Sequence, residues 1–488
     1  MLGRRRKLNH RGSTVVYLIP VLLLFLYLLY SQILTTSPPS LRLQTSTPCA
    51  SHTHSPELKF LFYAPHSGFS NQLSEFKNAA LLSSLLNRTL VVPPVLDHHA
   101  LALGSCPKFR VLPSRDIRLS VWESSLLLLR DNRYVSMADI VDVSPLVSSS
   151  TIRTIDFRVF ASWWCGVKIE MVCSSQSTSL EPSVFNRLKE CGSFLAGFGG
   201  NVDGCLYAID KDCRNTVWTY GEDEEDGKLD SFQPDEQLKK KKNISFVRTR
   251  RDVFKTLGPG SEADRARILA FGSLFTAPYK GSQLYIDINK SSKDTRLQKL
   301  LEDTDFLPFA PQIVNAGKQF ALNTIKVPFL CAQLRLLDGQ FKNHWRATFS
   351  SLKEQIKSLR QGASSRTINI FVMTDLPEGN WSTTYLGELM RDKNNYRLHF
   401  LREGDDLVHD TGRELAAAGN GYRLGITPNG IRGLEEIKMN CSPQRLPDVL
   451  LYIEEVICSC ASLGFVGTAG STIADSIDLM RRQKICSS

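Results

Sequence analysis

Short apolar runs alternate with helix-like segments in both halves of this chain, and this alternation restricts the fold more than any other feature. In the first half, an apolar run at 58–65 precedes a helix-like segment at about 72–86 and a second apolar run at 90–92. A strand–helix–strand unit of this kind places two parallel strands side by side, with the helix crossing between them. The chain is therefore predicted to be an α/β protein.

The second half repeats the alternation more clearly. Pro447 suits the first turn of a helix in which Val449, Ile453, Val456 and Cys460 share one face. The other elements predicted in this half are strands at 329–334, 368–374, 397–401 and 463–466, with helices around 350–361, near 383–391 and from about 473 onward.

Alternating elements in two halves predict two Rossmann-like, doubly wound domains that face each other across a cleft, at 58–320 and 321–488. Inside the first domain, 221–243 carries an acidic block and then a basic block, with almost nothing to bury. It predicts a surface loop or an interdomain linker. A calcium loop is the alternative, but Glu222 to Asp226 are contiguous acids and lack the alternating ligands of an EF-hand.

The N-terminus predicts the compartment. Val15 to Tyr30 contain no charge, and with 31–34 the segment reaches the roughly 20 residues that cross a bilayer as a helix. Basic residues precede it, so we expect a cytoplasmic tail at 1–13, a signal anchor at 14–34 and a Ser-, Thr- and Pro-rich stalk at 35–57. The prediction is a single-pass type II protein of the Golgi membrane or endoplasmic reticulum. A cleaved signal peptide is the alternative, but its apolar region is usually shorter.

The cysteines and sequons fit an oxidising lumen. All 12 cysteines lie after the apolar segment, which predicts up to six disulfides, with Cys458 and Cys460 too close to pair with each other. The chain contains neither a CxxC pair nor an HExxH motif, so no zinc site is expected. The predicted N-glycosylation sites are Asn87, Asn243, Asn289, Asn380 and Asn440.

Composition adds a limited constraint. The chain has 488 residues, 42% of them hydrophobic, and a formal net charge of +10. These values exclude a disordered chain and raise the question of an anionic partner, of which nucleic acid is only one candidate.

Three polar loops follow predicted strands, at the strand ends where open α/β sheets bind ligands. The first is "HSGFSNQLSEFKN", residues 66–78, where free backbone N–H groups at a helix N-terminus suit phosphate or sugar hydroxyls. A plain turn gives the same letters, since Gly, Ser and Asn are turn residues.

The second and third loops carry anion-binding chemistry. In "CAQLRLLDGQ", Arg335 leaves a buried strand, and its planar guanidinium can hold two phosphate oxygens. A structural ion pair with Asp338 is the alternative. In "GFVGTAGSTIADS", Ser471 or Thr472 can cap the next helix, with Asp475 completing a capping box around Thr472. Hydroxyls and amides at a helix N-terminus hold anions.

Together the blocks "GFSNQLSEFKNAALLSSLLNRTLVVPP", "QLR" and "FVGTAGST" resemble the protein O-fucosyltransferase family, particularly its large plant branch. The resemblance covers most of 58–482 and is loose in 110–320. It implies a type II membrane protein with the GT-B fold that uses GDP-fucose as donor, needs no metal or other cofactor, and acts on a hydroxyl of a protein or glycan. No nucleic-acid partner is implied.

Site residues follow from the resemblance position by position. Asn71 is implied to line the sugar-nucleotide cleft near the reacting centre, and Arg335 to contact the diphosphate and the glycosidic oxygen. Ser471 and Thr472 match a pair beside the β-phosphate, and Asp338 matches an acid that helps to hold the nucleotide. The remaining residues predicted to bind substrate are Gly68, Gln333, Gly467 and Thr468.

This chain departs from the family pattern at three places. Gln333 replaces the usual histidine before Leu-Arg, and an acidic residue common near the last strand is absent around Ser462. One branch carries a glutamate base just before the first Gly-Phe, and the corresponding region here reads His66-Ser67-Gly68, so His66 is the predicted base. The alternatives are His98, His99, Glu75, or no conventional base.

Two other functions stay open at this point. A GT-A enzyme would need an Asp-x-Asp metal loop, and the letters occur at 210–212 and 303–305 without a clear apolar strand before them. A non-catalytic lumenal binding or signalling protein on a glycosyltransferase scaffold is the second alternative.

Overall fold

The protein is described by a computed structural model in which the described residues all belong to one compact unit, within His52–Ser488. The predicted tail, anchor and stalk, and nearly all of the charged segment 221–243, lie outside the described residues. Among the described helices, none is sufficiently long and apolar to span a bilayer. The described residues are 58–96, 112–148, 152–173, 180–200, 204–211, 216–219, 240, 246–274, 299–300, 303–304, 306–337, 339–362, 367–426, 441, 443, 446 and 448–486.

A parallel sheet in the first half is built around a fully buried strand with helices on both of its faces. Its order is β3-β2-β1-β7-β4, and every neighbouring pair is parallel. Leu61 on one face packs in the same core as Phe76, whereas the ring of Phe60 on the other face lies 5.2 Å from that of Phe160. The strands are β1 (Phe60–Phe62), β2 (Thr89–Val92), β3 (Arg153–Asp156), β4 (Leu206–Ile209) and β7 (Ile268–Phe271).

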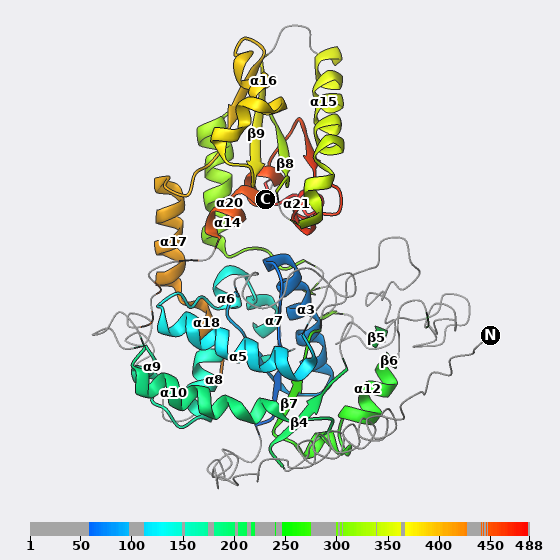
Figure 1. Cartoon of the computed structure of the whole chain (residues 1–488), viewed down its shortest axis with the longest axis vertical. Coiled ribbons are helices and arrows are strands. Elements are labelled where there is room, and N and C mark those ends of the chain that lie inside the picture. The colour runs from blue at the N-terminus through cyan, green and yellow to red at the C-terminus, as the bar shows by residue number, and fades with distance from the viewer. Residues whose placement is uncertain are drawn as a thin grey trace, which may run out of the picture. The chain divides into compact units, whose positions relative to one another are not determined.

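A second parallel sheet, of order β10-β9-β8-β11, is formed in the second half. Alternate residues of its central strand serve two cores: Cys331 packs with Ile453, and Leu330 packs with Leu352. Figure 1 shows β8 and β9 of this sheet with helices to either side. Both faces are therefore covered, which explains why the central segments 329–334 and 368–374 read as largely apolar runs. The strands are β8 (Phe329–Leu334), β9 (Ile368–Thr374), β10 (Tyr396–His399) and β11 (Gly464–Gly467). A separate parallel pair is β5 (Thr216–Thr219) with β6 (Phe246–Thr249).

In the second half, strands β8 to β11 alternate with helices, as the sequence predicts. The α-helices of the first half are α3 (Phe69–Leu85), α5 (Ser114–Arg130), α6 (Met137–Ile140), α7 (Ser144–Ser148), α8 (Phe157–Trp164), α9 (Ile169–Val172), α10 (Pro182–Cys191) and α12 (Arg250–Leu257). Those of the second half are α14 (Pro311–Gln319), α15 (Trp345–Gly362), α16 (Tyr385–Arg391), α17 (Asp406–Ala418), α18 (Asn420–Arg423), α20 (Val449–Ser459) and α21 (Thr472–Arg482). Short 3₁₀ segments are η1 (Gly192–Ala196), η2 (Ala263–Arg265), η4 (Gly339–Asn343) and η5 (Glu378–Thr383), and η3 (Phe320–Ile325) is a π-helical segment.

Most predicted elements are confirmed within a few residues, and one boundary difference matters for function. The first helix begins at Phe69 rather than near residue 72, because the backbone amides of Asn71 and Gln72 already donate to the carbonyl of Gly68. Asn71 therefore lies in the first turn of a helix and not in a free loop. The predicted α/β class is confirmed, whereas the domain boundary at about 320 stays a prediction.

Disulfides join described cysteines that are distant in sequence. Cys458 and Cys460 do not pair with each other, as predicted: the first bonds Cys331 of β8 and the second bonds Cys486. Each described cysteine is disulfide-bonded. The other two bonds between described residues are Cys165–Cys191 and Cys173–Cys441.

Candidate functional site

The ends of β8 and β11 are joined by hydrogen bonds through Thr468. Its hydroxyl accepts from the backbone amide of Arg335 (2.9 Å) and donates to the carbonyl of Gln333 (3.2 Å). The Gln333 side-chain oxygen in turn accepts from the amide of Thr468 (3.1 Å). The predicted loops after β8 and β11 are thus bonded to each other, because neighbouring parallel strands end at the same edge of a sheet. The side-chain amide of Gln333 therefore bonds the backbone of the adjacent loop, within the protein.

Arg335 is half-buried, and its position is fixed from a third strand. Asp375, just after β9, accepts from the amides of Leu336 (2.7 Å) and Leu337 (3.0 Å). The Arg335 guanidinium lies over the ring of Phe341, 4.6 Å from its centroid. The alternative of an ion pair with Asp338 falls outside the described residues. We did not predict Asp375 from the sequence, although an acid directly after a buried strand is a signal that could have found it.

The N-terminus of α21 presents a buried hydroxyl. Gly470 has a φ of 81°, and Ser471 then caps the helix without a side-chain cap hydrogen bond. The capping box expected around Thr472 is therefore wrong, since Ser471 occupies the cap. The Ser471 hydroxyl is fully buried and has no partner among the described residues. Gly467 allows this close turn, because a Cβ there would lie 2.6 Å from that of Ala474.

A second group of predicted residues lies at the end of β1. Ser67 adopts a left-handed backbone with a φ of 67°, and Gly68 is the N-cap of α3. The side-chain oxygen of Asn71 is buried without a partner among the described residues. Phe69 packs against Tyr452 of α20, with centroids 4.6 Å apart, which places this turn beside the helix that leads into β11.

The structure buries His66 completely. Its Nδ1 lies 2.8 Å from the Ser67 hydroxyl and its Nε2 lies 2.8 Å from the Ser273 hydroxyl. The alternative base Glu75 is equally buried, with Oε1 3.5 Å from the His66 Nε2. Its pKa is raised well above the usual value, mainly by burial. The catalytic role of His66 stays a prediction, and His98 and His99 lie outside the described residues.

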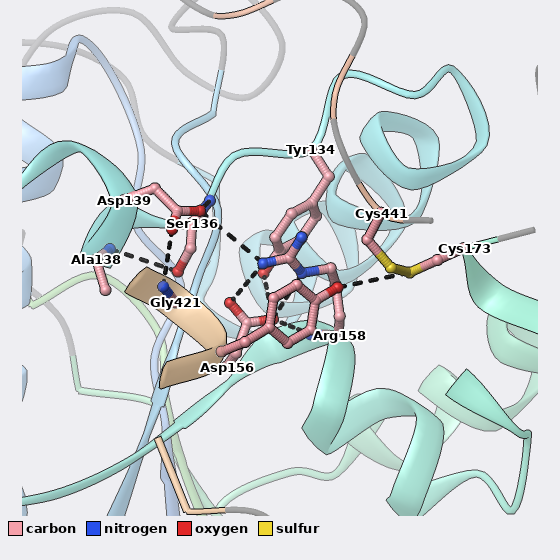
Figure 2. Close-up of polar contacts among 10 residues, drawn as sticks. Tyr134, Ser136, Ala138, Asp139, Asp156, Arg158, Cys173, Gly421 and Cys441 are labelled. Carbon is pink, nitrogen blue, oxygen red and sulfur yellow. Dashed lines mark hydrogen bonds and ion pairs between the residues drawn. A yellow bond between two sulfur atoms is a disulfide. The ribbon is translucent and has the colours of Figure 1, made fainter. Parts of the chain in front are cut away.

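A separate polar cluster surrounds Arg158 (Figure 2). Its guanidinium is sandwiched between the rings of Tyr134 and Tyr422, 4.2 and 3.8 Å from their centroids, and donates to both oxygens of Asp156 (2.9 and 3.2 Å). Burial opposes the charge, but Asp156 and the tyrosines raise the pKa of Arg158 above its usual value. Asp139 accepts from the amide of Gly421 (2.8 Å). The cluster therefore links α6 and α8 to α18, and sequence reasoning did not find it.

The remaining predicted features are placed as follows. Asp210 pairs with Arg118 (3.2 Å) rather than standing free for a metal, and in the described part of the chain no three His, Cys, Asp or Glu side chains are grouped to hold one. Thr472 is exposed at the start of α21. Asn87 and Asn380 are exposed, as glycosylation would require, and the other three predicted glycosylation sites lie outside the described residues.

Comparison with known proteins finds a relative whose sequence is similar to this chain over most of its length. The chain is 60% identical over 430 residues to O-fucosyltransferase 30 of Arabidopsis thaliana, covering 88% of this chain and 84% of the relative. No family model matches the chain. A crystal structure of POFUT1 in complex with GDP-fucose is similar with a TM-score of 0.35 and 13% identity, over 88% of this chain and 95% of that one. The fucosyltransferase NodZ from Bradyrhizobium gives a TM-score of 0.32 and 10% identity, over 87% and 92%.

Identity at this level over most of both chains decides the assignment. The chain belongs to the O-fucosyltransferase family.

Proposed function

We propose that this chain transfers fucose from GDP-fucose to a hydroxyl group of a protein or glycan, with inversion at the sugar carbon and without a metal ion. Family membership supports the reaction class. The structural observation that carries the donor site is the Ser471 hydroxyl at the N-terminus of α21, which is fully buried without a partner among the described residues and lies on the same loop as Thr468. A buried polar group without a partner costs free energy, which a ligand oxygen would recover.

The residues around that hydroxyl suit a diphosphate. An 11-residue helix points its N-terminus, with its free N–H groups and partial positive charge, toward the same loop. Arg335 is held beside it through the Thr468 hydrogen bond and Asp375. Together they supply hydrogen-bond donors and positive charge for the phosphate oxygens of GDP.

The mechanism follows from where charge develops. As the bond between fucose C1 and the diphosphate stretches, negative charge accumulates on the departing GDP and positive charge on the sugar ring. Arg335 and the α21 N-terminus stabilise that negative charge more strongly in the transition state than in the intact donor, which is the condition for acceleration. Asn71, whose side-chain carbonyl oxygen has no partner in the described part of the chain, is the group we assign to the sugar side of the site.

We also propose the GT-B arrangement, in which the two parallel sheets belong to separate Rossmann-like domains with GDP-fucose between them. The anchor at 14–34, lumenal orientation and Golgi or endoplasmic reticulum residence are proposals of the same kind. They rest on the uncharged run Val15 to Tyr30 and the basic residues before it.

The test is calorimetric titration of the full-length protein in detergent with GDP-fucose, GDP and UDP, together with a transfer and donor-hydrolysis assay. We expect GDP and GDP-fucose to bind more tightly than UDP. Arg335→Ala should weaken GDP binding at least about tenfold and abolish transfer, because a charge-assisted contact is lost. The exposed Arg402→Ala is the matched control and should change neither.

Two outcomes would contradict the proposal. Unchanged transfer in Arg335→Ala would reject the role of this side chain. Binding of GDP-fucose by the unmodified protein without transfer to any hydroxyl acceptor and without hydrolysis would favour the alternative of a binding or signalling protein.

A further inference from the structure

One side of α3 is polar where a helix packed on a sheet is normally apolar. Gln72, Glu75 and Asn78 follow each other at intervals of three residues and lie on one side of the helix. The first two are fully buried, and Asn78 is 8% exposed. Buried polar groups persist in proteins when their hydrogen bonds are made, so the partners of these three side chains are informative.

Each of the three side chains bonds the backbone just after a strand. The Gln72 amide nitrogen donates to the carbonyls of Ser67 and Leu96 (both 2.7 Å), and its oxygen accepts from the Leu96 amide (2.9 Å). Ser67 follows β1 and Leu96 follows β2. Gln72 therefore fixes two strand ends relative to each other.

Glu75 and Asn78 extend the pattern to a third strand. The Glu75 carboxyl group accepts from the amide of His66 after β1 and from the amide of Leu274 after β7, both at 3.1 Å. The Asn78 amide donates to the carbonyl of Leu274 (2.8 Å). Since β1 lies between β2 and β7 in the sheet, one helix face holds the ends of the three adjacent strands.

His66 belongs to the same network. Its backbone amide is bonded by Glu75, while its ring bonds the hydroxyls of Ser67 and Ser273. Ser67 has a left-handed backbone conformation that a non-glycine residue adopts only when its surroundings hold it. The next residues are Gly68, which caps α3, and the first turn that carries Asn71.

We propose that Gln72, Glu75 and Asn78 form a positioning ladder that sets the geometry of the Asn71 turn, and that Glu75 and His66 act as positioning residues rather than as the catalytic base. The link to catalysis rests on the proposed function. A displacement of about 1 Å at a reacting centre can cost roughly 100-fold in rate, so a rigid support beneath Asn71 has a catalytic consequence.

The test uses Glu75→Gln, which keeps the size of the side chain but presents an N–H₂ group to one of the two backbone amides. Amide hydrogen exchange of the full-length protein is the first readout. We expect exchange at His66 and Leu274 to accelerate at least about tenfold, while peptides from β8 and β11 stay unchanged. Ser83→Ala is the matched control, because Ser83 is buried on the same helix and its hydroxyl donates to Ala80 within the helix.

Catalysis is the second readout, and it separates positioning from general stability. The rate per GDP-binding site should fall about 10- to 100-fold in Glu75→Gln, while GDP affinity stays within about twofold. A role in stability alone would lower the number of active sites and leave the rate per site unchanged. Asn78→Leu, which removes the bond to the Leu274 carbonyl after β7, should show faster exchange at 268–274 and a smaller loss of rate.

The possible outcomes test the positioning ladder separately from the proposed transfer of fucose. Unchanged exchange at His66 and Leu274 in Glu75→Gln overturns the ladder, whatever the activity. Faster exchange with an unchanged rate per site overturns its catalytic role. Faster exchange in a protein whose unmodified form transfers no fucose supports the ladder and rejects the proposed function.

Discussion

The backbone amide of Arg335 donates a hydrogen bond to the hydroxyl of Thr468, 2.9 Å away, although 133 residues separate the two in sequence. The same hydroxyl donates to the carbonyl of Gln333. A single side chain thus fixes the backbone on both sides of Leu334, directly before the guanidinium that we assign to the diphosphate. The orientation of Arg335 depends on Thr468 as much as on its own strand.

Replacing Thr468 should therefore weaken nucleotide binding without any direct loss of charge. Thr468→Val keeps the shape but leaves the Arg335 amide and the Gln333 carbonyl without this partner, at a cost of about 1–3 kcal/mol. We expect GDP affinity measured by calorimetry to fall about 5- to 30-fold. Thr468→Ser, which keeps the hydroxyl, should bind within about threefold of the unmodified protein. Equal binding by the valine and serine variants would contradict the interpretation.

Ser471 should show opposite effects on stability and on binding. Its hydroxyl is buried without a partner among the described residues, so Ser471→Ala removes an uncompensated polar group. We expect the melting temperature without nucleotide to be unchanged or higher, and GDP affinity to fall about tenfold. Ser351→Ala, on the exposed side of α15, is the control for both measurements. A clear loss of stability in the absence of nucleotide would show that the hydroxyl has a protein partner.

Buried carboxyls on α20 should make stability depend on pH. Burial raises the pKa of Glu455 to about 8, and burial followed by repulsion from Glu455 raises that of Glu454 well above its usual value. The native state therefore holds protons that the unfolded chain releases near pH 4.5. The contribution of these two carboxyls to the free energy of unfolding is fully present below that pH. It is lost as the pH rises toward 8, by up to about 1.4 kcal/mol per pH unit for each group.

Glu455→Gln tests this dependence, because glutamine mimics the neutral acid at every pH. Denaturant unfolding between pH 5 and pH 8 should show a shallower decline in the variant, with higher stability at pH 8 than in the unmodified protein. Exposed Glu388→Gln is the control and should leave the slope unchanged. If the free energy of unfolding of the unmodified protein rose with pH between pH 5 and pH 8, the predicted direction of the pH dependence would be wrong.

The Arg158 cluster should contribute to stability far more than a surface ion pair. Arg158→Met leaves Asp156 and Asp139 buried without their cation, which should lower the free energy of unfolding by about 3–5 kcal/mol. Arg158→Lys keeps the charge but cannot donate to both Asp156 oxygens while lying flat between two tyrosine rings, so it should recover only part. Exposed Arg130→Met, beside Asp131, should cost less than about 1 kcal/mol. A similar loss in the free energy of unfolding for Arg158→Met and Arg130→Met would contradict the prediction that the buried cluster contributes more than a surface ion pair.

The candidate site could be predicted from the sequence only as far as its local pieces. The strand ends that precede Arg335 and Thr468 were correctly predicted to within a residue, because strands and glycine-rich turns are local patterns. Asp375 and Ser273 were not found, since each acts on a segment reached through a different strand. His66 looked available in the sequence, because nothing in its neighbours indicates that Ser273, 207 residues away, covers its ring nitrogen.

The sequence by itself determined the parallel α/β architecture, since strands buried on both faces must be continuous apolar runs and their polar turns must fall at one edge of each sheet. It also determined which loops could carry chemistry. Only the tertiary structure decided which hydroxyls stay unpartnered and which acids and imidazoles are buried. Those properties depend on side chains brought together from distant parts of the chain, and no local pattern of residues encodes such contacts.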